Sequence, residues 1–152
     1  MREMLKKQVD QSGRLEDARA TVWAYADGGS RSLLMPAAVK RKALAALKRR
    51  DITGARALLR VYTAVVFLLL KDVITTRDIV IELDREYPGY DADIKAMLLR
   101  KFRQKGINVS DEAIVFGNIG KLAEAHRVAW QIFVGRKEPD HRATWPEVKK
   151  VL

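Results

Sequence analysis

The sequence predicts an α/β fold: one domain with a mixed β-sheet that begins with a hairpin and is flanked by helices. Its 152 residues suit a single domain, since domains commonly span about 100–200 residues. Residues 21–27 and 32–35 are rich in β-forming and apolar side chains and flank a Gly-Gly-Ser turn, which is typical of a β-hairpin. Two helical segments follow, and strand-like and helical segments then alternate, as expected of an α/β sheet.

Residues 1–20 are polar and charged, with few apolar side chains. We predict only a short helix here, broken at the Ser12-Gly13 dipeptide, because Gly is unfavourable inside a helix. The chain is therefore divided into an N-terminal polar segment, residues 1–20, and a single α/β domain, residues 21–152.

Two helices are predicted after the hairpin. Residues 37–50 contain strong helix formers, and Pro36 precedes them at a position that the first turn of a helix tolerates. Residues 52–74 are apolar almost all the way round a helix, which is typical of a helix buried on several sides. A β-strand over residues 61–70 is the competing interpretation, because a short apolar run does not distinguish the two.

The second half of the chain alternates between strands and helices. Residues 78–84 (DIVIELD) form the clearest predicted strand, and residues 113–119 form another. Residues 90–105 and 121–135 each carry one apolar face at helical spacing. The tail after residue 136 is expected to form a short final helix.

Composition narrows the class of protein. Lys and Arg number 29 against 19 Asp and Glu, a net charge of +10, and such an excess favours polyanionic partners, most commonly nucleic acid. The alternative is that the charge only keeps the surface soluble. The absence of cysteine excludes disulfides, thiolate metal sites and cysteine nucleophiles. The longest apolar run has ten residues, about half of a membrane span, so we expect a soluble, cytoplasmic protein without membrane partners.

No local catalytic motif is present. The sequence lacks GxxxxGK[ST], GxGxxG, HExxH and GxSxG patterns, which argues against nucleoside triphosphate hydrolysis and serine-hydrolase chemistry. The remaining candidates are carboxylates at the ends of predicted strands. Glu82 and Asp84 share one face at the carboxyl end of an apolar strand, where open α/β sheets usually bind ligands. Asp27 ends the first predicted strand, before two glycines.

Each of these acids also has a structural interpretation. Asp27 suits a plain hairpin turn, because Asp-Gly is a favoured turn dipeptide. Asp84 could instead form a salt bridge with Arg85 at the end of its strand. On the last long helix, Glu124 and His126 cannot share a face at a spacing of two, so one of them is expected to point into a site. His126 also suits a hydrogen-bonded packing role.

The placement of these residues resembles the ribonuclease H-like fold. Nucleases, integrases and resolvases of that superfamily carry a carboxylate on the first strand, another on a central strand, and an acidic or histidine ligand on the final helix. Asp27, Asp84 and His126 or Glu124 match these places. Two features depart from the family: the hairpin is normally extended by a third strand, which the sequence does not locate, and residues 37–50 lack the glutamate that ribonuclease H enzymes carry on the first helix.

The resemblance implies a nuclease that hydrolyses phosphodiesters with two Mg²⁺ or Mn²⁺ ions, which carboxylate oxygens suit as ligands. Its implied catalytic residues are Asp27, Asp84 and His126, and its implied metal ligands are Asp27, Glu82, Asp84 and Glu124. The nucleic-acid partner, DNA or RNA, is expected to contact the basic residues Lys40, Arg41, Lys48, Arg49, Lys121 and Arg127. The alternatives are a non-enzymatic DNA- or RNA-binding module, and a protein-interaction module whose charge only maintains solubility.

Overall fold

The computed structural model describes residues 5–26, 29–74 and 79–152. These form a single α/β domain with one six-stranded mixed sheet in the order β5-β4-β1-β2-β3-β6. Strand β2 pairs antiparallel with both β1 and β3, β4 pairs parallel with β1, β5 parallel with β4, and β6 parallel with β3. The strands are β1 Leu5–Ser12, β2 Thr21–Ala26, β3 Ser30–Met35, β4 Ile79–Asp84, β5 Ile114–Gly117 and β6 His141–Arg142.

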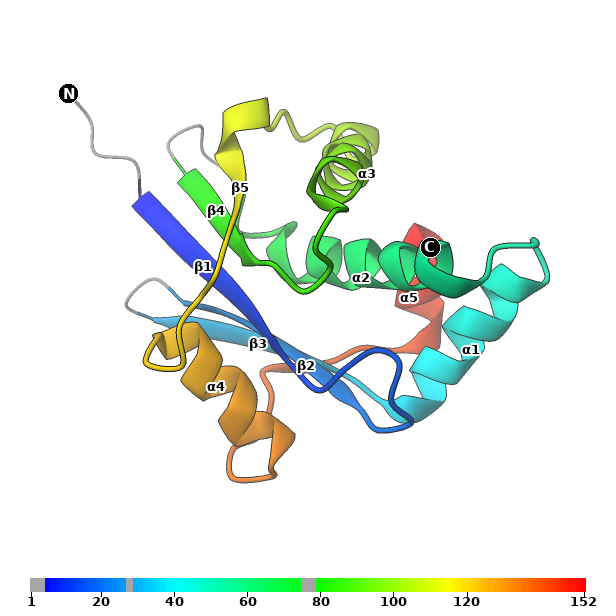
Figure 1. Ribbon diagram of the computed structural model, residues 1–152, viewed down its shortest axis with the longest axis horizontal. Coiled ribbons are helices and arrows are strands. Elements are labelled where there is room, and N and C mark those ends of the chain that lie inside the picture. The colour runs from blue at the N-terminus through cyan, green and yellow to red at the C-terminus, as the bar shows by residue number, and fades with distance from the viewer. Residues whose placement is uncertain (1–4, 27–28, 75–78) are drawn as a thin grey trace.

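Helices cover both faces of this sheet (Figure 1). Helix α4 packs on one face, where Val128, Ala129 and Ile132 meet Val22 and Ala24 of β2. The other face carries the larger core, formed with the remaining α-helices. The helices are α1 Ala37–Lys48, α2 Gly54–Leu70, α3 Asp91–Gln104, α4 Glu124–Phe133 and α5 Trp145–Val151, with a short 3₁₀ turn at Asp111–Ala113.

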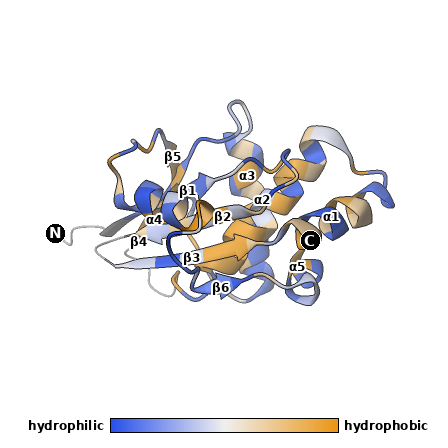
Figure 2. Cartoon of the chain, turned by 90° about the horizontal axis from the view of Figure 1, so that it is seen from below, coloured by the Kyte–Doolittle hydropathy of each residue, from blue (hydrophilic) through white to orange (hydrophobic). Residues whose placement is uncertain are grey.

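Residues 61–70 belong to a helix and not to a strand. Helix α2 runs from Gly54 to Leu70 and is buried on nearly all sides, because it lies between the sheet, α1, α3 and α5. Figure 2 shows the consequence, with apolar residues gathered where the helices meet the sheet and polar ones at the periphery. In the described ranges, none of the helices combines the length and the apolar character needed to cross a membrane.

The first strand corrects the interpretation of the N-terminal segment. The short helix predicted within residues 1–20 is wrong: Leu5–Ser12 is strand β1, at the centre of the sheet between β2 and β4. A boundary at residue 20 therefore does not separate this segment from the sheet. The strand was not predicted because residues 5–12 are mostly polar. In the fold, two of these polar side chains have cross-strand partners. Lys7 Nζ donates to Tyr25 Oη at 2.9 Å, and Gln8 Nε2 donates to Glu82 Oε1 at 2.8 Å.

Candidate metal centre

Three carboxylates meet at one end of the sheet. Asp10 lies near the end of β1, Asp84 ends β4, and Glu86 follows two residues later; one oxygen from each lies within 4.8 Å of the others. The parallel register pairs Val9 with Leu83, so Asp10 and Asp84 come next on two adjacent strands. Because the carboxyl ends of adjacent parallel strands lie at the same edge, the two side chains reach one place.

Hydrogen bonds hold two of these carboxylates in place. Asp84 Oδ1 accepts from the backbone N–H of Ile119 at 2.8 Å, in the segment between β5 and α4. Asp10 Oδ1 accepts from the backbone N–H of Gln11 at 2.8 Å, and Asp10 Oδ2 lies 2.7 Å from Nδ1 of His126 on α4. Asp10 is only 3% exposed. The site is therefore assembled from β1, β4, the loop after β5, and α4.

Burial makes this cluster electrostatically unfavourable without a cation or a proton. Burial raises the pKa of Asp10 above its ordinary value, and nearby Asp84 adds to the rise, while the Gln11 N–H and His126 oppose it. Burial, followed by a hydrogen bond and repulsion from Asp84, raises the pKa of Glu86 to about 8. A proton on Glu86 relieves the repulsion near neutral pH, and a divalent cation that displaced this proton would relieve it more fully.

The residues predicted from the sequence separate into those inside this centre and those outside it. Asp84 belongs to the three-carboxylate cluster, and His126 contacts Asp10 within it. Glu82 lies one pleat earlier on β4, where Gln8 donates to it and its carboxylate packs against Gly117. Glu124 begins α4 and is half-buried outside the cluster. Asp27 lies outside the described residues.

Sequence reasoning missed Asp10 and Glu86. Asp10 went unseen because its strand was not recognised. The sequence signal was weak: Asp10 follows Val9, as Asp84 follows Leu83 in the clearest strand, but residues 6–8 before Val9 are all polar. Glu86 stands only two residues after Asp84, and nothing local shows that the chain turns back there toward the same carboxylates.

The basic residues also divide into two groups. Lys40 is 2% exposed, and its Nζ donates to the backbone carbonyls of Arg14, Asp17 and Arg19 at 3.2, 3.0 and 2.6 Å. The prediction that Lys40 contacts nucleic acid is wrong, because α1 packs against the β1–β2 loop and the buried Lys40 ammonium group donates to that loop's carbonyls. The predicted phosphate contacts that are exposed are Arg41, Lys48, Arg49, Lys121 and Arg127.

Comparison with known proteins identified no relative of this chain. The chain matches no protein-family model, and no curated protein or solved structure is significantly similar to it.

Proposed function

We propose that this protein is a metal-dependent nuclease with a ribonuclease H-like core, in which Asp10, Asp84 and Glu86 hold Mg²⁺ or Mn²⁺. The observation that carries the proposal is the convergence of these three carboxylates from β1, β4 and the segment after β4. Oxygen-only donor sets suit hard divalent cations, which retain waters and take a few carboxylates. The net charge of +10 suits a polyanionic substrate.

The topology supports the resemblance to the ribonuclease H-like fold, because it supplies the third strand that the sequence did not locate. Strand β1 precedes the hairpin β2–β3 and pairs with it, so a three-stranded antiparallel unit is present. With β1 as the first strand, the first-strand carboxylate is Asp10 in place of Asp27, Asp84 ends strand β4 inside the sheet, and His126 lies on α4, the helix that follows β5. The first helix, α1, still carries no glutamate, and Glu86 supplies the third carboxylate from another element.

Bound metal ions would supply an activated water and would stabilise the leaving oxygen of a phosphodiester. The side chains of the chain have separate tasks. The N–H groups of Gln11 and Ile119 orient Asp10 and Asp84. His126 positions Asp10 through the contact of its Nδ1, as outer partners of metal ligands commonly do. Lys121 precedes α4 and Arg127 lies on it. Both are exposed, where they can hold a substrate phosphate.

The direct test incubates the purified protein with single- and double-stranded DNA, RNA and an RNA–DNA hybrid, with Mn²⁺, with Mg²⁺ or with EDTA. We expect cleavage that requires the metal, and nucleic-acid affinity that falls steeply with salt because binding releases counterions. Salt-dependent binding without cleavage under any of these conditions would contradict the nuclease and favour the binding module. Absence of binding at low salt would remove both and leave a protein-interaction module.

The pKa of Glu86 predicts how stability and metal affinity depend on pH. Because this pKa is about 8 in the folded protein and about 4.3 in an unfolded chain, the folded state holds an extra proton between these values. The metal-free protein should therefore lose stability as pH rises from about 5 to 8, and Mn²⁺ affinity should rise over the same window as the proton leaves. Urea unfolding in EDTA and calorimetric Mn²⁺ titration measure the two trends. In Glu86→Gln both trends should weaken, and an unchanged pH dependence would contradict this role for Glu86.

A further inference from the structure

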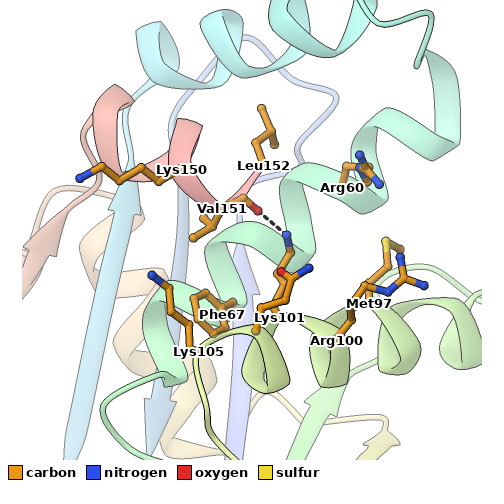
Figure 3. Close-up of a pocket in the computed structure, with 10 residues that line it drawn as sticks. Arg60, Phe67, Met97, Arg100, Lys101, Lys105, Lys150, Val151 and Leu152 are labelled. Atoms are coloured by element: carbon orange, nitrogen blue, oxygen red, sulfur yellow. Dashed lines mark hydrogen bonds between the residues drawn. The ribbon is translucent and has the colours of Figure 1, made fainter.

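A cavity separate from the carboxylates lies between α2, α3 and α5, on the face of the sheet opposite α4 (Figure 3). It has a volume of about 270 Å³, and among the described residues no Asp or Glu side chain lines it. In the view of Figure 3, Lys101 lies between Arg60 and Arg100 on one side and Lys105 and Lys150 on the other. We call these five residues the basic pocket.

The five cations of the basic pocket have no acidic side chain of the described residues paired with them. Lys101 Nζ donates to the backbone carbonyl of Val151, which carries no net charge. Arg60 lines the cavity, and its buried Nε has no hydrogen-bond partner among the described residues. A buried guanidinium N–H without an acceptor is unfavourable, so the described residues leave part of the Arg60 guanidinium unsatisfied.

The electrostatics of the basic pocket agree with this geometry. Burial, together with repulsion from Arg60 and Arg100, lowers the pKa of Lys101 to about 8. Burial lowers the pKa of Arg60, and Arg50, Arg56 and Arg100 lower it further. Like charges held together in a hollow repel one another, and an anion bound among them removes that repulsion. Guanidinium groups match phosphate oxygens in geometry and in charge.

An adjoining cavity of about 340 Å³ extends from the basic pocket between α2 and α3. The two share Arg60, Met97 and Arg100. The second cavity is more apolar, with Ile52, Leu59 and Tyr90 in its wall, and Tyr90 is 38% exposed. A partly exposed aromatic ring in the wall of a cavity that arginines also line is a surface on which a nucleobase can stack.

We propose that these two cavities bind a nucleotide with linked phosphates, whose phosphate chain occupies the basic pocket and whose base occupies the adjoining cavity. The site is separate from the three carboxylates and does not depend on the proposed nuclease function. It uses side chains in place of the glycine-rich backbone loop that the sequence lacks. The same linked-phosphate chemistry could come from a free nucleotide or from the phosphorylated end of a nucleic-acid strand, and the experiment distinguishes the two.

The test measures binding by calorimetry and by thermal unfolding, at low salt and in EDTA so that no metal is bound. The probes are ATP, GTP, inorganic triphosphate, and an oligonucleotide with or without a 5′-triphosphate. We expect nucleoside triphosphates to bind and to raise the unfolding temperature, since a ligand that binds only the folded state stabilises it. Triphosphate alone should bind more weakly. Tighter binding of the 5′-triphosphorylated strand than of free nucleotide would assign the site to strand ends.

The variant Arg60→Gln/Arg100→Gln should lose at least about tenfold in affinity, because two charge-assisted contacts are removed. Without ligand it should unfold at the wild-type temperature or higher, because repulsion with Lys101 is relieved. Lys42→Gln/Lys137→Gln removes the same charge from exposed positions outside both cavities and should bind like the wild type. Asp84→Asn should also bind nucleotide normally, which separates this site from the carboxylates.

Three results would overturn the proposal in whole or in part. Equal loss of affinity in Arg60→Gln/Arg100→Gln and in Lys42→Gln/Lys137→Gln would show that nucleotide responds only to net charge. Wild-type protein that binds none of the probes would show that the five cations have no phosphate ligand. Inorganic triphosphate binding as tightly as ATP and GTP would remove the base from the assignment.

Discussion

Replacing Asp84 by Asn is expected to lower metal-dependent cleavage by more than about 100-fold, since even outer partners of metal ligands often contribute about 10–100-fold. The amide keeps an oxygen that can accept the Ile119 N–H, so the fold should survive. Removal of one negative charge beside the substrate phosphate should leave nucleic-acid affinity unchanged or higher. Gel-based cleavage assays, binding titrations and calorimetric Mn²⁺ titration of one preparation measure all three quantities.

The matched control is Glu112→Gln, which removes a carboxylate from an exposed turn that is not part of the cluster. Its cleavage rate and Mn²⁺ affinity should equal those of the wild type. Asp84→Asn protein that cleaves at the wild-type rate would exclude Asp84 as a metal ligand. A fall in thermal stability without a selective loss of cleavage would assign Asp84 a structural role.

Replacing Lys40 by Met is expected to lower the free energy of unfolding by about 3 kcal/mol, because it leaves backbone carbonyls in the β1–β2 loop without their donor. Methionine retains an unbranched apolar chain, so the loss is mainly of hydrogen bonds. In a protein of this size the unfolding temperature should fall by roughly 10 °C. Below that temperature nucleic-acid affinity should stay at the wild-type value, since the ammonium group is buried.

Lys42→Met tests the same chemical change two residues along α1, at an exposed position. Its stability should remain within about 0.5 kcal/mol of the wild type. Urea denaturation of both variants, with the salt dependence of nucleic-acid affinity, makes the comparison. If Lys40→Met kept the wild-type stability but bound nucleic acid more weakly, Lys40 would contact phosphate as the sequence suggested.

The sequence by itself determined the elements whose signals are local. The Gly-Gly turn between apolar runs predicted the hairpin that became β2 and β3. Helical periodicity predicted α1, α3 and α4, and the all-round apolar character of residues 52–74 predicted a buried helix, α2. The alternating run before Asp84 predicted β4. Each signal lies within one element, because side-chain periodicity needs no distant partner.

Only the tertiary structure decided the features that depend on contacts between segments far apart in the sequence. Strand β1 is polar, and it is a strand because β2 and β4 pair with it on both sides. That pairing places Asp10 beside Asp84, from segments more than seventy positions apart, and so forms the candidate metal centre. The burial of Lys40 likewise depends on a loop in a different part of the chain. A local sequence pattern does not predict such partners. The strand register and the contacts between distant segments form only when the whole sheet and its helices pack together.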